Sequence, residues 1–335
     1  MSRQGFVPLG ERMGEGAPPA IADAPDGLRD AVVRTLRRLG LWGRGMVVAV
    51  PYLWLLLFFL IPFLIVFKIS FSEAMIAQPP YSALLAWIED PDFSELKLQV
   101  TLTLTSYVRL LSDNLYVVAY LSSVKMALVS TVLCLLIGYP MAYAIARARP
   151  SLRGPLMMLV VLPFWTSFLI RVYAWIGILK PEGLLTLLLQ TIGLYGPDDQ
   201  VQIFRTDTAV FIGIVYSYLP FMVLPLYSAL EKLDGTLLEA ASDLGCPPWK
   251  AFWRITFPLS IPGVVAGAMI CFIPITGEFV IPDLLGGAET LMIGKTLWTE
   301  FFGNRDWPLA SAVAVLLLLL LVVPIAIFQN QQQKV

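Results

Sequence analysis

The chain has 335 residues, of which 58% are apolar and 14% charged, and its formal net charge is −1. Soluble domains average about 45–50% apolar and about 25% charged residues, so this composition indicates a polytopic membrane protein and argues against a nucleic-acid-binding one. Since the chain has no histidine, the commonest metal ligand, we expect no metal site and no cofactor.

The N-terminal residues 1–40 are rich in Gly, Pro, Ala and Arg and contain no long apolar run. We expect a disordered cytoplasmic tail. Cytoplasmic loops of membrane proteins carry an excess of Lys and Arg, and five arginines precede the first apolar segment. The charge pattern therefore predicts that both chain ends face the cytoplasm. These arginines are Arg29, Arg34, Arg37, Arg38 and Arg44.

Six segments are long and apolar enough to cross a bilayer as helices, which takes about 20 residues each. We therefore predict an all-α membrane domain over residues 41–330. The predicted spans are residues 46–67, 117–146, 156–179, 209–230, 259–281 and 309–328.

The loop between the first two predicted spans is long and acidic, with Glu89, Asp90, Asp92 and Glu95. It is expected on the outer side of the membrane. One interpretation is an amphipathic segment at the membrane surface. The other is part of a platform for an extracytoplasmic binding protein.

Two features inside the spans concern helix packing. Gly263 and Gly267 form a G-x-x-x-G pair, which permits close helix contact, and we consider the partner to be a second membrane subunit. The three cysteines, Cys134, Cys246 and Cys271, are far apart in sequence and are interpreted as small buried residues.

A polar segment between the fourth and fifth spans predicts a short amphipathic helix. Thr236 and Glu239 have the spacing of a capping box, Gly245 suits a left-handed helix end, and Pro247 and Pro248 prevent continuation. A second short helix is expected from Trp249. The ordinary alternative is a capped helix in a cytoplasmic loop.

The same segment reads Glu239-Ala240-Ala241-Ser242-Asp243-Leu244-Gly245, then nine residues, then Ile255-Thr256-Phe257-Pro258. It resembles the EAA loop of permease subunits of bacterial ATP-binding-cassette (ABC) importers, with Phe257 in place of the usual Leu. The resemblance implies a six-helix permease of the type I importer architecture. Residues 236–257 would form cytoplasmic coupling helices that dock on an ATPase subunit. The docking residues it implies are Glu239, Ala240, Ala241, Asp243 and Gly245.

Further motifs, at residues 162–175, 218–227, 277–287 and 304–308, resemble the first permease subunit of polyamine importers. The Gly-Glu-Phe-Val-Ile-Pro run at residues 277–282 is more similar to the putrescine type than to the spermidine-preferring type. The resemblance covers roughly residues 40–330.

Membership of that family implies a heterodimer with a second permease, two ATPase copies and a periplasmic polyamine-binding protein in the bacterial inner membrane. ATP and magnesium would be bound by the ATPase. The chain itself has no G-x-x-x-x-G-K-[S/T] phosphate loop, so we expect it to be non-catalytic.

A diamine is a dication, so its path requires carboxylates and aromatic faces where water is scarce. Glu278 lies near the outer end of the fifth predicted span. It either contacts the substrate cation or forms an ion pair with Arg171. A helix break near Pro274 and Gly277 would free carbonyl groups for a cation. The further candidates for the pathway are Asp283, Tyr173, Trp175, Trp298, Glu300 and Asp306.

The aromatic candidates also have a structural interpretation. Trp298, Tyr173 and Trp175 could equally be interfacial or lipid-facing anchors. Two other functions also remain open. One is the same architecture importing another solute, such as an amino acid, sulfate or Fe(III). The other is a proton-coupled secondary transporter that uses Glu278, which leaves the EAA-like segment unexplained.

Overall fold

The computed structural model describes residues 44–89, 96–194, 196 and 202–332. The predicted N-terminal tail lies outside the described residues. The chain divides into two units, Met1–Phe63 and Leu64–Val335, which are described separately.

The described part of the first unit is helical. Helix α2 (Arg44–Leu55) continues through a π-helical turn, η1 (Leu56–Leu60), into α3 (Ile61–Ile69), which extends into the second unit. Residues Val47–Ile69 together are long and apolar enough to span a membrane, in agreement with the first predicted span.

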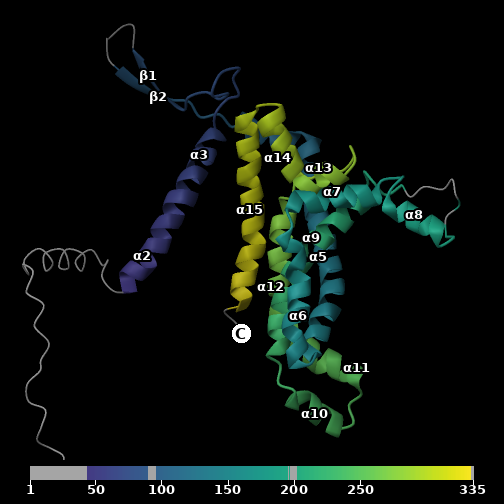
Figure 1. Cartoon of the computed structure of the whole chain (residues 1–335). Coiled ribbons are helices and arrows are strands. Elements are labelled where there is room, and N and C mark those ends of the chain that lie inside the picture. Colours follow the sequence, from purple (N-terminus) through teal and green to yellow (C-terminus); the bar gives the residue numbers. More distant parts are fainter. Residues whose placement is uncertain (1–43, 90–95, 195, 197–201, 333–335) are drawn as a thin grey trace, which may run out of the picture. The chain divides into compact units, whose positions relative to one another are not determined.

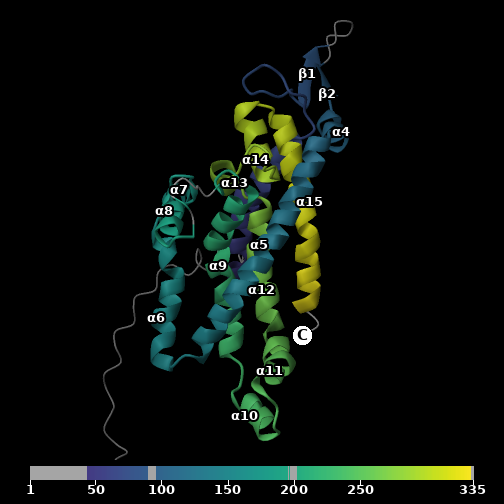
Figure 2. The ribbon, with the colours of Figure 1, turned by 90° about the vertical axis from the view of Figure 1, so that its right-hand side faces the viewer.

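The second unit is built on three long helices that lie side by side, α5 (Asn114–Arg147), α9 (Asp207–Glu231) and α12 (Phe257–Thr276), as Figures 1 and 2 show. Short elements sit at both ends of this bundle. In Figure 1, α10 and α11 lie at its lower end, and α13 and α14 lie at its upper end. The other elements are α4 (Thr105–Ser112), α6 (Pro150–Val161), η2 (Leu162–Trp165), α7 (Phe168–Leu179), α8 (Leu184–Thr191), α10 (Thr236–Asp243), α11 (Pro248–Ala251), η3 (Phe252–Thr256), α13 (Val280–Leu285), α14 (Ile293–Trp298), η4 (Thr299–Gly303) and α15 (Trp307–Gln332).

Glycines allow α12 to lie directly against α9. A Cβ at Gly263 would lie 2.5 Å from the Cβ of Ala229, and a Cβ at Gly267 would lie 2.8 Å from Sδ of Met222. The predicted close helix contact of the G-x-x-x-G pair is therefore present, and it is made with α9 of this chain rather than with a second subunit. The backbones of α9 and α12 are held together by this close approach.

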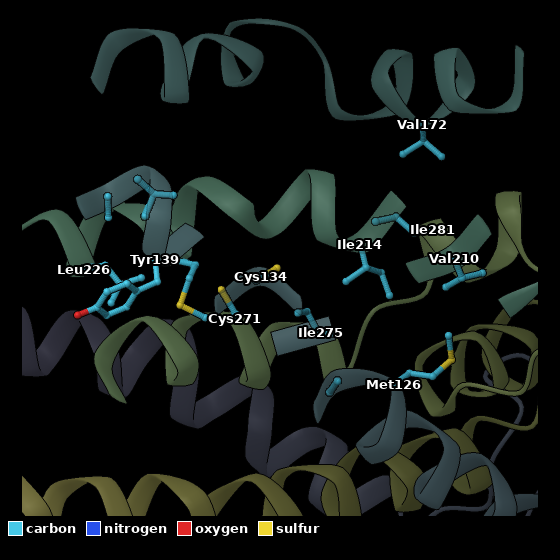
Figure 3. Packing of buried hydrophobic residues seen from close by; sticks show 14 of the residues in the cluster. Met126, Cys134, Tyr139, Val172, Val210, Ile214, Leu226, Cys271, Ile275 and Ile281 are labelled. Atoms are coloured by element: carbon cyan, nitrogen blue, oxygen red, sulfur yellow. The ribbon is translucent and has the colours of Figure 1, made fainter. Parts of the chain in front are cut away.

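The core between the three helices is apolar, with a few small polar links. Tyr139 on α5 and Ser260 on α12 share a hydrogen bond of 2.8 Å. Cys134 and Cys271 are fully buried, as predicted, and their thiols meet between α5 and α12 (Figure 3). Each thiol also lies near a carbonyl oxygen of α9, at 3.8 Å and 3.5 Å. Cys246 is only partly buried, so the prediction is wrong for this residue.

The apolar segments agree with the predicted membrane domain, with two corrections. Among the described residues, five helices are each long and apolar enough to cross a membrane, and α6 to α7 makes a sixth span only if the bent pair is taken as one. The third predicted span, residues 156–179, is therefore not a single straight helix, because its two parts meet at 89° after Trp165. The fifth begins earlier, at Pro248, and ends at Thr276 rather than residue 281.

A small β-hairpin adds to the otherwise helical architecture. Strands β1 (Leu85–Glu89) and β2 (Leu96–Val100) pair antiparallel, with Leu85 opposite Val100. This hairpin belongs to the loop for which the sequence suggested either a surface segment or a binding platform. Neither interpretation is tested by the hairpin itself.

Candidate functional sites

Helix α10 begins where the EAA-like segment predicted, but its cap differs. The backbone N–H of Thr236 donates to Oδ1 of Asp234 at 3.0 Å, and the hydroxyl of Thr236 makes no cap. The predicted capping box is therefore wrong, because Gly235, rather than Thr236, occupies the cap position. This backbone hydrogen bond lowers the pKa of the exposed Asp234 carboxyl.

The C-terminal end of α10 has the predicted left-handed glycine. Gly245 has a φ of +73°. Its N–H donates to the carbonyl of Ser242, and the N–H of Cys246 donates to the carbonyl of Ala241 at 2.9 Å. This pair of bonds is a Schellman motif, which satisfies the last carbonyls and reverses the chain.

The surface of α10 is open to a partner. Glu239, Ala240 and Asp243 are exposed, whereas Ala241 is buried and anchors the helix. Leu244 on the apolar side is 88% exposed. An amphipathic helix with an unfilled apolar side is typical of a segment that docks into a groove.

The second helix of the segment is joined rigidly to the membrane domain. Pro248 begins α11, and the helix runs through η3 into α12 without interruption, giving one segment from Pro248 to Thr276. Trp249 and Trp253 pack edge to face, with ring centroids 5.6 Å apart. Helices α11 and α12 are therefore parts of one continuous helical segment.

At the opposite end of α12 the helix breaks as predicted. It ends at Thr276, two residues after Pro274, and Gly277 follows as its C-cap. Glu278 lies in the break rather than inside the fifth span, which corrects its predicted position. Its Oε1 accepts the backbone N–H of Val280 at 3.0 Å, so the carboxylate caps the short helix α13.

Glu278 is also tied to α9. The hydroxyl of Tyr218 donates to Oε2 of Glu278 at 2.7 Å. The proposed ion pair with Arg171 is therefore wrong: Oε2 accepts Tyr218, and the Arg171 guanidinium lies over the rings of Phe164 and Phe168, 4.9 Å and 5.7 Å from their centroids.

The break is held in place by a glycine of α14. A Cβ added at Gly294 would lie 2.7 Å from the carbonyl oxygen of Glu278 and still closer to that of Gly277. Only glycine permits this approach of α14 to the broken helix. The position of Glu278 therefore depends on Gly294, which the sequence did not single out.

Two further predicted residues lie near this break. Asp283 on α13 is exposed and pairs with Lys295 at 3.8 Å, a contact worth at most about 1 kcal/mol at such an exposed position. Trp298 is 43% exposed and stacks on Phe279, with centroids 4.6 Å apart and planes 12° apart. The break thus presents carboxylates beside a stacked aromatic pair, an arrangement suited to an organic cation.

Glu300 and Asp306 form hydrogen bonds and an ion pair that stabilise the fold. Glu300 is buried and accepts hydrogen bonds from Tyr116 at 2.9 Å and Asn304 at 2.8 Å. Asp306 caps α15 through the N–H of Leu309 and pairs with Arg109 at 3.3 Å. Glu278 is also bonded on both oxygens, so these bonds do not exclude Glu300 and Asp306, whose role in the pathway stays a prediction.

Tyr173 and Trp175 do not join the group around Glu278. Tyr173 is 58% exposed on α7, and Trp175 packs edge to face on Tyr216, with centroids 5.3 Å apart. The structure is thus consistent with the alternative that assigns them to the surface and to packing.

A cavity of about 510 Å³ opens between the two broken spans. Phe164, Phe168 and Arg171 line it from the break between α6 and α7. The other lining residues come from α9 and α12 and are Ser217, Tyr218, Phe221, Ile270 and Pro274. Tyr218 therefore lines the cavity and also holds Glu278.

The comparisons with known proteins agree with this architecture. Residues 134–335 match the family described as "Binding-protein-dependent transport system inner membrane component". The chain is 40% identical over 268 residues to the spermidine/putrescine transport system permease protein PotB of Haemophilus influenzae, covering 80% of this chain and 86% of that protein. It is 30% identical to the inner membrane ABC transporter permease protein YdcU of Escherichia coli, covering 69% of this chain and 77% of that protein.

Among solved structures, the chain is similar to one chain of a bacterial ABC transporter involved in the import of the acidic polysaccharide alginate. The TM-score is 0.61 at 17% identity, with 91% of this chain and 99% of that chain covered. At this identity the likeness concerns the fold alone. The predicted fold of an ABC importer permease is confirmed.

Proposed function

The chain belongs to the family of inner-membrane components of binding-protein-dependent transport systems, and from this membership we propose that it forms half of the polyamine pathway of an ATP-driven importer. The observation that carries the proposal is the carboxylate of Glu278, placed in the break after α12 and held there by Tyr218. Phe279, the residue after Glu278, stacks on Trp298 of α14.

The substrate assignment rests on charge and on the polyamine permeases to which the chain is similar. Carboxylates and aromatic faces in a weakly hydrated site favour an alkylammonium ion and disfavour an anion. Asp283, being exposed, supplies a second carboxylate on α13. Putrescine is favoured over spermidine by the sequence at residues 277–282.

The proposed complex contains a second permease, two ATPase copies and a periplasmic polyamine-binding protein. In this arrangement the chain catalyses no covalent step, and ATP and magnesium are bound by the ATPase. The distribution of positive charge supports an orientation with both termini, α10 and α11 in the cytoplasm and with α13 and α14 on the periplasmic side.

Coupling in this proposal passes through α10, whose exposed Glu239, Ala240 and Asp243 dock on the ATPase. ATP-driven closure of the ATPases displaces α10 and α11. Because α11 continues into α12 and the glycines hold α12 against α9, the two spans move together. Glu278 follows the end of α12 and is bonded to Tyr218 in the middle of α9, so the movement reaches the break.

The experiment is uptake of putrescine and spermidine into cells or proteoliposomes that contain the complete complex. The variant is Glu278→Gln, which keeps an acceptor for Tyr218 and removes the charge. Glu289→Gln, an exposed glutamate in the loop before α14, is the matched control. Loss of one partner of a desolvated charge pair costs enough to lower uptake at least about ten-fold.

The proposal predicts ATP-dependent uptake by wild type and by Glu289→Gln, and its loss in Glu278→Gln with the complex still assembled. An assembled wild-type complex that takes up neither polyamine would refute the substrate assignment. Uptake that survives ATP depletion and follows a proton gradient would instead identify a secondary transporter.

A further inference from the structure

We propose that the cavity between the broken spans receives a carboxylate side chain of the second permease subunit, with Arg171 as its partner. The inference rests on the proposed assembly of the chain with a second permease. It assigns an anionic occupant to the cavity, whereas the polyamine itself belongs to the site around Glu278.

Arg171 is a buried cation that lacks an anionic partner among the described residues. Its side chain is buried, with 9% of the residue exposed, and it lines the cavity. Its Nε has no hydrogen-bond partner, and among the residues that the structure describes no carboxylate lies within 4 Å of the guanidinium. Buried charges are stable when they are paired and hydrogen-bonded, so this cation requires an anion from elsewhere.

Arg171 also lies in the first turn of α7, at the positive end of the helix dipole. Arg171 is the fourth residue of α7, whose cap residue Ser167 offers no side-chain bond. In the part of the chain that is described, the N–H groups of Phe168, Leu169 and Ile170 donate to no backbone carbonyl, as expected for a first helical turn. The positive end of the helix dipole thus adds to the charge of Arg171 at the cavity wall.

The chemistry of the cavity favours a carboxylate over an acyl chain or a polyamine as its occupant. Acyl chains cannot accept hydrogen bonds, and a polyamine is repelled by the combined positive charge of Arg171 and the α7 N-terminus. The residues that line the cavity include no Asp or Glu, and the Tyr218 hydroxyl among them donates to Glu278. A carboxylate matches the guanidinium in charge and in hydrogen-bond geometry.

The experiment measures how much second permease is recovered with a tagged form of this chain from membranes that contain the complete complex. The variants are Arg171→Gln, which removes the charge, and Arg171→Lys, which retains it. The exposed Arg149, between α5 and α6, provides the control Arg149→Gln. We expect recovery with Arg171→Gln to fall about thirty-fold, as for one partner of a buried charged pair, and recovery with Arg171→Lys to stay closer to that of the control.

A second measurement keeps the inference falsifiable if Arg171→Gln does not accumulate. Cells carrying Arg171→Glu are selected for restored uptake. The inference predicts suppressors that replace one Asp or Glu in a membrane span of the second permease by a neutral or basic residue. Suppressors confined to this chain or to the ATPase would overturn it.

Other occupants give distinct results. Equal recovery of the second permease with Arg171→Gln and Arg149→Gln would refute the inference, and altered polyamine uptake by that assembled variant would place the cavity in the substrate pathway. Binding of the second permease that is restored by anionic phospholipid would assign the cavity to a lipid phosphate. Because recovery is measured without substrate, the inference can fail while the polyamine assignment stands, and the reverse.

Discussion

Gly294 offers the sharpest test of how the break around Glu278 is held. In the structure the first turn of α14 lies against the backbone of Gly277 and Glu278, and a Cβ at position 294 would lie 2.7 Å from the carbonyl oxygen of Glu278. We therefore expect Gly294→Ala to displace the break and to reduce polyamine uptake.

The size of the effect follows from the atoms involved. Both carbonyl groups near the added methyl belong to the backbone, so no flexible side chain can move aside. Overpacking at such a position costs about 1–3 kcal/mol, which is about a five-fold to hundred-fold change in the population of the native break.

Uptake and thermal unfolding of the purified complex are the measurements. Gly154→Ala in α6 is the matched control, because a Cβ at Gly154 meets nothing within 4 Å and alanine favours a helix over glycine by about 1 kcal/mol. If Gly294→Ala melts at the same temperature as Gly154→Ala and transports equally well, the break does not depend on this close approach.

Three further predictions concern the docking helix and the tie between α9 and the break. Gly245→Ala should lower recovery of the ATPase and coupled uptake, because a side chain at a φ of +73° costs about 1–2 kcal/mol. The control Gly235→Ala, at a φ of −61°, should be close to wild type. Equal behaviour of the two variants would show that the left-handed turn at Gly245 is not needed for docking. Tyr218→Phe should lower uptake about ten-fold, because it removes a hydrogen bond to the Glu278 carboxylate. The control Tyr52→Phe, at an exposed tyrosine, should not lower it. Unchanged uptake by Tyr218→Phe would show that transport does not need the bond between Tyr218 and Glu278. Because the pKa of Asp234 is lowered in the folded chain, its cap is present above the ordinary aspartate pKa of about 3.9 and is lost as the pH falls through the lowered pKa. Amide hydrogen exchange of α10 should therefore differ between wild type and Asp234→Ala at neutral pH and converge in acid.

The helix ends show where sequence reasoning succeeds and where it stops. The left-handed end at Gly245 was predictable because glycine and the following prolines determine it locally. The start of the helix was not, since Asp234 and Thr236 can both bond a first-turn N–H group, and only the turn geometry places Gly235 at the cap position with Asp234 accepting from Thr236. Hydropathy located the spans because it depends on composition over about 20 residues. The same averaging hid the 89° bend after Trp165, where two polar residues interrupt an apolar run.

The candidate site depended on contacts between distant residues. Glu278 was identifiable as an acid in an apolar context, but its tie to Tyr218 joins residues 60 positions apart and has no local signature. Gly294 was missed for the same reason, because its neighbour is backbone from another helix. Glu300 and Asp306 carried the right charge for a cation path, and only their bonds to Tyr116 and Arg109 reveal their structural use.

The exposed apolar residues of the segment from α10 to α11 also affect how stable the chain is in the cell before it assembles. Leu244 and Trp249 are 88% and 70% exposed, and Leu244 lies outside the described helices that are long and apolar enough to span a membrane. Exposed apolar surface of this kind marks an unassembled subunit for chaperones and proteases. Synthesis of this chain in excess of its ATPase should therefore shorten its half-life, so that membrane quality control adjusts the stoichiometry of the complex.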